Sequence, residues 1–232
     1  MKPIPLILVA VAIVIIAPFI YMPFVETSDP QFGDLPWQIE VADDGTARAL
    51  GFTLGASTLG DARARYGEEL EIAIVTPKDG KSSLEGYNGS TKAGFITGRL
   101  VVTADLPAQL IAAMRERAVK TEFMESTTRK ATLHPEDLPA ALAAPIAALG
   151  FIPTANLDAP TILERFGEPA ERFKGAGQQE HFLYPALGLG ITLDPDGKEL
   201  LQYVAPRDFE RLRAPLLATR QDAAAGEAPP AQ

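Results

Sequence analysis

The sequence predicts an α+β fold: two tandem repeats, each a helix followed by an antiparallel sheet, behind an N-terminal transmembrane helix. The first observation is a duplication, because the motif Ala-Leu-Gly-Phe occurs at 49–52 and again at 148–151. A second motif, Arg-(Tyr or Phe)-Gly-Glu, occurs at 65–68 and 165–168. A spacing of about 100 residues between the copies indicates two versions of one supersecondary unit. The other two observations are an uncharged N-terminal stretch and the same order of helix, strands and helix in both halves.

Composition limits the classes of function. The chain has 232 residues, 47% of them hydrophobic and 22% charged, which is ordinary for a protein with a packed core. The formal net charge of −9 disfavours nucleic acid as a partner, because an acidic surface repels phosphate. The absence of cysteine excludes disulfides, thiolate metal ligands, cysteine nucleophiles and lipid attachment through cysteine.

Residues 4–25 are predicted to form the membrane anchor. They carry no charge, and as a helix they would span about 33 Å, close to the thickness of a bilayer core. A cleaved signal peptide with its hydrophobic part at 6–17 is the alternative, but no small-x-small cleavage site follows that stretch. Lys2 precedes the segment, and residues 26–47 contain six acidic residues and no Lys or Arg. The positive-inside rule therefore predicts a single-pass inner-membrane protein with its C-terminal bulk in the periplasm.

Breaks in composition set the predicted boundaries. Prolines at 135, 139 and 145 limit helix formation between the repeats, and the C-terminal end is rich in Ala and Pro without a hydrophobic face. The predicted parts are an anchor (1–25), a spacer (26–45), repeat 1 (46–120), a connector (121–145), repeat 2 (146–218) and a disordered tail (219–232).

Each repeat is predicted to open with a short helix. In repeat 1, Thr58 is the expected N-cap, Asp61 completes a capping box, and Gly67 ends the helix in a left-handed conformation. In repeat 2 the corresponding residues are Asp158 at the cap and Gly167 at the end. Apolar residues at helical spacing form the buried face of each helix: Leu59, Ala62 and Tyr66 in the first, and Ala159, Ile162 and Phe166 in the second.

Strand-like segments follow each helix, and a proline with a second helix closes each repeat. In repeat 1 the predicted strands are 70–75, 82–87 and 95–103, with turns at 77–80 and at Asn88-Gly89. In repeat 2 they are 171–174, 181–184, 189–193 and 200–204, with a hairpin turn at 195–197. The buried stripes of the closing helices are Leu110, Ile111, Met114 and Ala118 after Pro107, and Phe209, Leu212 and Leu216 after Pro206.

The helix-opening motif resembles that of the SmpA/OmlA (BamE-like) family of small outer-membrane lipoproteins. That family begins its helix with Gly-Met-Thr, follows with spaced apolar residues and ends with Gly-x-Pro. The matching positions are Asp158, Ile162, Phe166, Gly167 and Pro169 in repeat 2, Thr58, Ala62, Tyr66 and Gly67 in repeat 1, and Tyr184-Pro185 and Asp196-Gly197 in the later strands. The chain departs from the family at Ala56, Asn156 and Glu69, and it lacks the lipid-acceptor cysteine.

The duplication is also similar to the architecture of the β-lactamase-inhibitor proteins, in which two repeats form one concave protein-binding sheet. Together the two resemblances imply a binding scaffold without catalysis, and an anchor formed by the N-terminal helix in place of a lipid. Such a likeness at the level of the fold bears on function only indirectly.

Neither histidine sits in a pattern typical of a metal site. His134 precedes Pro135 and is expected to open a short helix. His181 follows Glu180 on a predicted strand, so their side chains face opposite sides of the sheet and are poorly placed to share a metal ion.

The other chemical candidates are interpreted as structural. Residues 194–199 and 88–90 are predicted to be turns rather than a calcium loop and a glycosylation site. Ser57 lacks the Gly-x-Ser-x-Gly setting of an activated nucleophile, and the glycines at 51, 55 and 60 do not make a dinucleotide fingerprint. We therefore expect no catalytic residue, no cofactor and no metal, and the sequence names no binding residue.

The leading hypothesis is a membrane-anchored binding or scaffolding protein of the bacterial cell envelope, non-catalytic, with envelope proteins as partners and an unspecified oligomeric state. One alternative is an envelope hydrolase or carbohydrate-active enzyme that uses a pair of carboxylates in a deep cleft. Another is a protein that binds a small ligand or lipid in an apolar cavity lined by Phe52, Phe151 and Leu189. The contact surface expected under the binding hypothesis is the combined sheet face, and an open sheet surface would favour this hypothesis over both alternatives.

Overall fold

The computed structural model describes residues 33–78, 80–124, 128–175, 177–195 and 197–226. Most of its regular structure is strand. A small sheet comes first, formed by β1 (Glu40–Val41), β2 (Ala47–Ala49) and β3 (Phe52–Thr53). The strands of the large sheet are β4 (Glu71–Thr76), β5 (Ser83–Ala93), β6 (Ile96–Ala104), β7 (Lys120–Phe123), β8 (Arg129–Thr132), β9 (Ile146–Pro153), β10 (Glu171–Lys174), β11 (Glu180–Tyr184), β12 (Leu189–Leu193) and β13 (Leu200–Val204).

The helices lie around the large sheet. They are α2 (Leu59–Tyr66), α3 (Ala108–Glu116), α4 (Leu138–Leu142), α5 (Ala159–Phe166) and α6 (Glu210–Gly226), with single 3-10 turns between other elements. The predicted anchor, residues 4–25, lies outside the described residues. Within the described ranges, no helix combines the length and the hydrophobicity that crossing a bilayer requires.

The predicted fold class, α+β with two tandem helix–antiparallel-sheet repeats, is wrong. The structure is mainly β, and its strands from both halves form one antiparallel sheet of ten, in the order β10-β11-β12-β13-β9-β6-β5-β4-β8-β7. The join is β9, which pairs with β13 on one side and with β6 on the other; Leu149, for example, faces both Tyr203 and Val102. Because β9 satisfies the edges of both halves, neither half keeps a sheet of its own.

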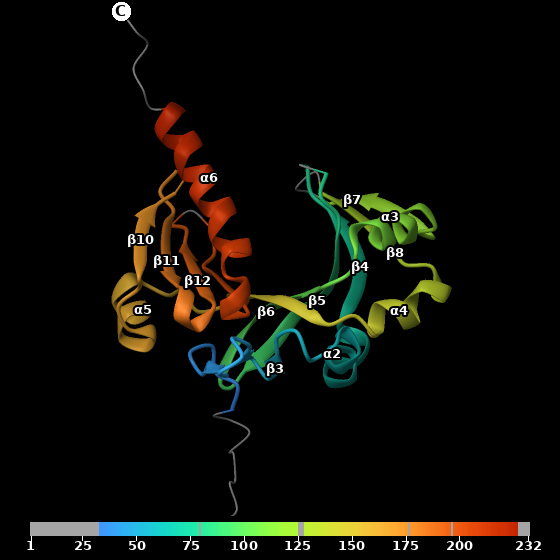
Figure 1. The fold of residues 1–232 in the computed structure, drawn as a ribbon, viewed down its shortest axis with the longest axis horizontal. Coiled ribbons are helices and arrows are strands. Elements are labelled where there is room, and N and C mark those ends of the chain that lie inside the picture. Colours follow the sequence, from blue (N-terminus) through green and yellow to red (C-terminus); the bar gives the residue numbers. More distant parts are fainter. Residues whose placement is uncertain (1–32, 79, 125–127, 176, 196, 227–232) are drawn as a thin grey trace, which may run out of the picture.

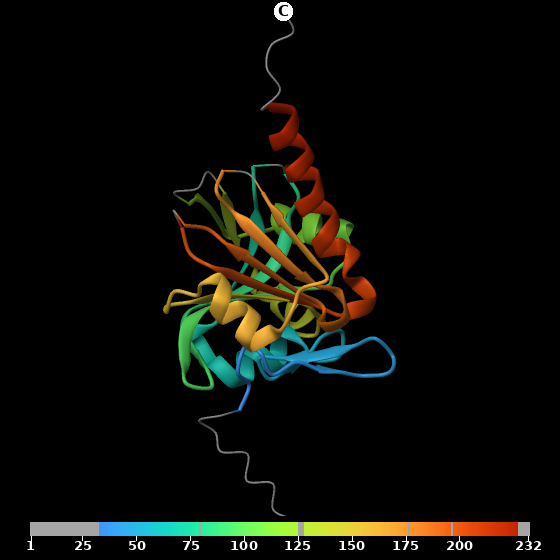
Figure 2. The same cartoon turned by 90° about the vertical axis from the view of Figure 1, so that its left-hand side faces the viewer.

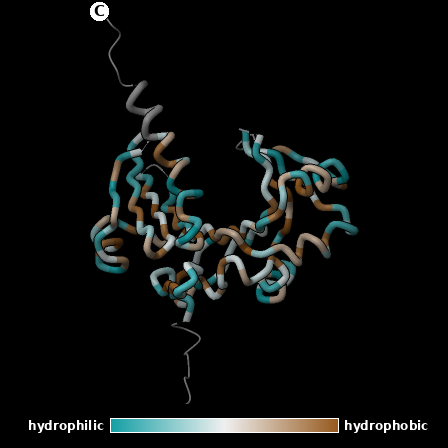
Figure 3. Tube along the Cα trace, viewed as in Figure 1, coloured by the Kyte–Doolittle hydropathy of each residue, from teal (hydrophilic) through white to brown (hydrophobic). Residues whose placement is uncertain are grey.

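The large sheet bends into a U, and its two surfaces are covered unequally (Figure 1). Helices α2, α3, α4 and α5 and the small sheet lie on the outer, convex side, whereas α6 lies on the inner side of one arm. The outer side holds the main core, which includes Leu54, Leu59, Phe151, Phe182 and Tyr203, all less than 2% exposed. Buried positions alternate with more exposed ones along β6 and most of β5 and β9, as expected when only one side of a sheet is fully buried. Figure 3 shows hydrophobic segments in both arms of the U.

The two predicted opening helices are confirmed. In α2 the Thr58 side chain accepts a hydrogen bond from the Asp61 amide at 3.2 Å, and Asp61 accepts one from the Thr58 amide at 2.7 Å, which completes the capping box. In α5 the Asp158 carboxylate accepts a hydrogen bond from the Thr161 amide at 2.9 Å. Both helices have eight residues and end at a glycine with positive φ, Gly67 or Gly167. Their ψ angles are −143° and −168°, so the left-handed conformation predicted for Gly67 is wrong.

The other duplicated motif takes two different shapes. Ala49–Phe52 is the tight turn between β2 and β3, with positive φ at Leu50 (51°) and Gly51 (85°). Ala148–Phe151 is extended and lies inside β9. Sequence identity over four residues therefore does not extend to conformation, because the pairing partners of the two segments differ.

Most predicted strands are found, with two corrections. Asn88-Gly89 is not a turn: it lies inside β5, which continues through an irregularity between Asn88 and Thr91 as far as Ala93. The predicted connector contributes β7 and β8, which extend the sheet beyond β4. These two strands carry charged residues at half their positions, so their sequences lack the apolar alternation that predicts a strand.

The predicted ends of the second half also change. The closing helix α6 packs through Phe209, Leu212 and Leu216, as predicted, but continues to Gly226, past the predicted start of the tail at 219. In Figure 2 it runs along one side of the sheet and away from the small sheet. Residues 34–41, predicted as spacer, pack against the body, with Leu35 only 5% exposed.

Candidate functional site

One face of the large sheet is left open over much of its width. Strand pairing places one residue from each of six adjacent strands in a row across the sheet, and their side-chain positions share one face. In strand order the row is Gly190, Gln202, Gly150, Val101, Tyr87 and Glu71. A neighbouring row on the same face is Val204, Ala148, Thr103, Glu85, Ala73, Thr132 and Lys120.

Helix α6 covers one end of these rows and leaves the other end free. A Cβ atom at Gly190 would lie 2.6 Å from Leu212 of α6, so helix and strand are in close contact there. Val204 at the head of the second row is also buried beneath α6. Tyr87 of β5, by contrast, is 41% exposed. Figure 1 shows no described helix on the inner side of the arm that contains β4 and β5.

We define the open face as nine inward-facing residues of β4, β5, β6 and β9 beyond α6, which leaves out the buried Ala73 and counts Glu71 as its border. They are Val75, Ser83, Glu85, Tyr87, Arg99, Val101, Thr103, Gly150 and Ile152. Tyr87 and Arg99 are exposed, and the apolar Val75, Val101 and Ile152 are half-buried. An exposed aromatic ring beside apolar side chains and a peripheral arginine is the residue mixture that protein–protein interfaces favour.

The glycines and small residues keep this face shallow. Gly150 lies at the centre of the first row, where a Cβ atom would meet nothing closer than Val101 at 3.6 Å. Ser83, Thr103 and Gly150 lie among the larger side chains of this face. A partner could therefore contact backbone and hydroxyl groups as well as the tyrosine.

Charged residues border the open face and are paired with one another. Lys130 of β8 donates a hydrogen bond to Glu71 of β4 at 2.7 Å and lies 3.8 Å from Glu122 of β7. The hydrogen bond to Glu71 raises the pKa of Lys130. Hydrogen bonding to Lys120 lowers the pKa of Glu122. Glu85 accepts a hydrogen bond from the Ser83 hydroxyl at 2.6 Å.

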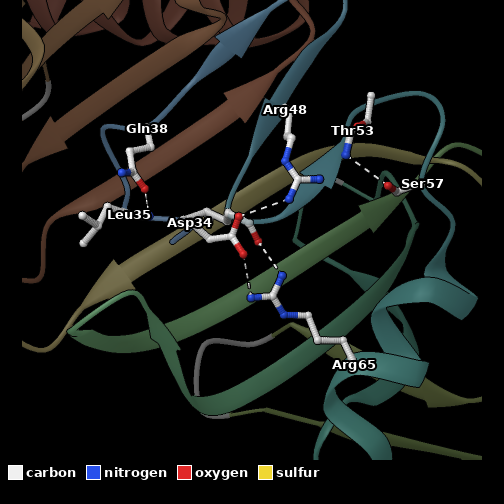
Figure 4. A network of polar contacts seen from close by, with 8 residues as sticks. Asp34, Leu35, Gln38, Arg48, Thr53, Ser57 and Arg65 are labelled. Carbon is white, nitrogen blue, oxygen red and sulfur yellow. Dashed lines mark hydrogen bonds and ion pairs between the residues drawn. The ribbon is translucent and has the colours of Figure 1, made fainter. Parts of the chain in front are cut away.

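An N-terminal strap, residues 34–41, lies on the outer side of the molecule, opposite the open face. Asp34 accepts hydrogen bonds from Arg65 at 3.1 Å and from Arg48 at 3.3 Å, and the Leu35 amide donates to Gln38 at 2.9 Å (Figure 4). The same view shows the Ser57 hydroxyl accepting a hydrogen bond from the Thr53 amide, at 3.0 Å.

The strap contacts both halves of the molecule through the duplicated arginines. Arg65 of α2 binds Asp34, and the Arg165 guanidinium of α5 lies 4.9 Å from the centre of the Trp37 ring. Between them the buried Tyr203 hydroxyl of β13 donates a hydrogen bond to the Pro36 carbonyl at 2.9 Å. The arginine that both copies of the motif share thus has a structural role, because Arg65 and Arg165 hold the strap from two sides.

The residues that the sequence singled out for chemistry are structural here. His134 caps a 3-10 turn by accepting a hydrogen bond from the Glu136 amide at 3.3 Å. His181 is buried between Phe173 and Thr192, with 2.9 Å from its Nδ1 to the threonine hydroxyl, and burial lowers its pKa. Ser57 closes a turn, as described above, and has no histidine among its hydrogen-bond partners.

The structure also places the residues that the two alternative hypotheses, an apolar ligand cavity and a carboxylate active site, would use. Phe52, Phe151 and Leu189, the proposed lining of an apolar cavity, belong to the main core with exposures of 3%, 0% and 0%. Over the described residues, no group of three or more His, Asp or Glu side chains is arranged to hold a metal ion. Among the acidic residues of the open face and its border, Glu71 is paired with Lys130 and Glu85 with Ser83.

No family model, curated protein or solved structure matches this chain. The geometry is therefore the main guide to function. The sequence predicted a combined sheet face as the contact surface but named none of its residues, because side-chain alternation alone does not tell which face the helices will cover.

Proposed function

We propose that this protein is a non-catalytic binding or scaffolding protein of the bacterial cell envelope. In this proposal it is anchored in the inner membrane by residues 4–25 and holds a partner protein on the open face, in the periplasm. The observation that carries the proposal is the uncovered inner surface of a ten-stranded sheet, centred on Tyr87. Strands from both halves pair across this surface, so a partner would meet a surface that is already formed, which lowers the entropy lost on binding.

The chemistry of the open face favours a protein partner. The net charge of −9 opposes binding to nucleic acid. A glycosidase would need two carboxylates facing each other across the substrate, about 5–10 Å apart. Here Glu71 and Glu85 have hydrogen-bond partners on the sheet itself. Tyr87, Val101 and Arg99 supply instead the aromatic, apolar and cationic groups that anchor protein interfaces.

The position of the strap supports an anchored orientation. Its first described residues lie on the outer side of the U, below the sheet in Figure 1, and Asp34, Pro36 and Trp37 are fixed there by three separate contacts. A membrane segment that precedes the strap would thus be tethered on the convex side. The open face would then point away from the attachment point and remain accessible to a periplasmic partner.

The test is photo-crosslinking in cells of the native host. A photoreactive amino acid replaces Tyr87 on the open face, and in a matched control it replaces Glu164, an exposed residue of α5 on the outer side. We expect a discrete crosslinked protein from position 87 that is absent from position 164, and that is lost when Val101→Asp is added. Equal products from both positions would contradict the assignment of the face.

The membrane part of the proposal has its own measurement. The full chain should stay in the pellet when membranes are extracted with alkaline carbonate, and it should be digested by protease added to spheroplasts. Release by carbonate would rule out the anchor, and protection in spheroplasts would rule out the periplasmic orientation.

A further inference from the structure

Strand β7 ends the large sheet as the described residues form it, and apolar side chains beside its outer edge are exposed. Within those residues it pairs with β8 alone, and it lies at the end of one arm of the U (Figure 1). Val119 is 58% exposed, Phe123 is 77% exposed and Met124 is 48% exposed. An exposed strand edge flanked by apolar residues is a template for pairing with another strand.

The hydrogen bonds to β8 determine which backbone groups of β7 are free. The Met124 amide donates to the Thr128 carbonyl at 2.8 Å, which makes this a hydrogen-bonded pair. Bonded pairs alternate along an antiparallel ladder, so Glu122 and Lys120 also direct their amides and carbonyls toward β8. Thr121 and Phe123 therefore direct theirs outward, where a further strand would bind.

We propose that two copies of this chain associate through β7, antiparallel about a two-fold axis at Thr121. In this register Thr121 faces Thr121 of the second copy in a hydrogen-bonded pair. Lys120 faces Glu122 of the second copy, whereas the Val119 amide donates to the Thr132 carbonyl at 3.0 Å and so stays with β8. The two-fold axis repeats the charge contact, so two opposite-charge pairs form together.

Neighbouring two-fold registers are unfavourable. Hydrogen-bonded pairs must join residues whose amides and carbonyls point outward, and these are every second residue of β7. The two-fold axis can therefore lie only at a residue, and neighbouring registers move it by one residue. An axis at Lys120 places the two lysines opposite each other, and an axis at Glu122 does the same with the two glutamates. An axis at Phe123 pairs Glu122 with Met124. Among these registers, the one centred on Thr121 is the one that sets opposite charges against each other.

The other end of the sheet shows the opposite design. If two copies paired antiparallel through β10, a two-fold axis at Glu171, Arg172 or Lys174 would place that residue opposite the same residue of the second copy. An axis at Phe173 would place Arg172 opposite Lys174. Every such register opposes like charges, which is how natural sheets protect an edge from self-pairing. The contrast between the two edges favours β7 as the site of association.

The charged residues of β7 are exposed enough to form ion pairs with a second copy. Lys120 and Glu122 already form an ion pair within one strand, at 2.7 Å, with side chains 65% and 41% exposed. In the dimer each lysine keeps this neighbour and gains Glu122 of the second copy directly opposite. The association leaves the open face free, so it extends the proposed function without depending on it.

Single cysteines test the register, because the chain contains none of its own. Thr121→Cys in the full chain, purified in detergent and oxidised with copper-phenanthroline, should form a disulfide dimer, since Cα atoms in a bonded pair lie about 5.5 Å apart. Lys120→Cys and Glu122→Cys should each crosslink poorly alone but well when mixed. Lys92→Cys, an exposed residue of β5, is the control. A Thr121→Cys yield no higher than that of the control would overturn the proposal, as would efficient crosslinking of Lys120→Cys with itself.

Charge reversal separates association from a general loss of folding. Lys120→Glu or Glu122→Lys alone should raise the dimer dissociation constant by about tenfold, because each sets like charges opposite each other twice. The double variant K120E/E122K restores opposite charges and should restore association, as measured by analytical ultracentrifugation in detergent. Failure of the double variant to recover, while its circular dichroism matches the wild type, would refute the register. Loss of the Tyr87 crosslink with β7 pairing intact would instead count against the proposed function alone.

Discussion

At the scale of single residues, Gly51 and Gly150 show how one motif serves two purposes. Both are the third residue of Ala-Leu-Gly-Phe. Gly51 has φ of 85°, and a Cβ atom there would lie 1.8 Å from the Arg65 guanidinium and 2.7 Å from the Asp34 carboxylate. Glycine at 51 therefore leaves room for the ion pair that holds the strap. Gly150 has no such neighbour, because its nearest contact would be Val101 at 3.6 Å.

The same substitution should have opposite effects at the two positions. Gly51→Ala should lower the free energy of unfolding by about 1–3 kcal/mol, because alanine is strained at positive φ and displaces Arg65 from Asp34. Gly150→Ala should change it by less than about 1 kcal/mol, toward higher stability, because an extended alanine has fewer unfolded conformations to lose. Urea denaturation of the two variants measures both values. Equal losses would show that Gly51 is not specifically required.

At the scale of elements, local signals were predictable and pairing partners were not. The caps at Thr58 and Asp158 and the glycine stops follow from residues within one or two turns, so sequence alone placed α2 and α5 correctly. Asn88-Gly89 has the local signature of a turn, yet β6 pairs along the whole of β5 and keeps it extended. Here a long-range ladder outweighs local preference.

The caps also predict a dependence of stability on pH. Hydrogen bonding by Thr161, through its side chain and its amide, lowers the pKa of Asp158 below its ordinary value of 3.8. The folded state therefore binds this proton less readily than the unfolded state. Its contribution to stability is complete above the unfolded pKa and is lost as the pH falls through the lower, folded pKa.

We compare the wild type with Asp158→Ser, which keeps a capping oxygen that does not titrate. The wild type should be the more stable protein at about pH 6, and its advantage should shrink steadily as the pH falls below about 4. Urea denaturation at a series of pH values gives the difference. An advantage that stays constant down to the acid limit would mean that the carboxylate charge has no part in the cap.

At the scale of the whole molecule, the two halves that carry the duplicated motifs share one sheet and one core. Strand β9 joins the strands of both halves, one core runs from Leu59 of α2 to Ile162 of α5, and the strap is held from both sides. This continuity could not be predicted, because the motif copies indicated two similar units and gave no information on the edge between them. The candidate site shares this limit: alternation predicted which residues share a face, but the position of α6 decides which part of it stays open.

A single body should unfold in one step, and the strap provides the probe. Trp37 is the only tryptophan of the chain and lies in the strap, so its fluorescence reports on the strap while circular dichroism reports on the sheet. Both signals should change at the same urea concentration.

Tyr203→Phe removes the buried hydrogen bond to the Pro36 carbonyl and should lower the free energy of unfolding by about 1–3 kcal/mol, moving both transitions together. Tyr87→Phe, which removes a hydroxyl from a 41% exposed side chain, is the control and should change stability by less than about 0.5 kcal/mol. If the Trp37 signal changed first and alone, the strap would be an independent attachment, and the two halves would be joined by the sheet without it.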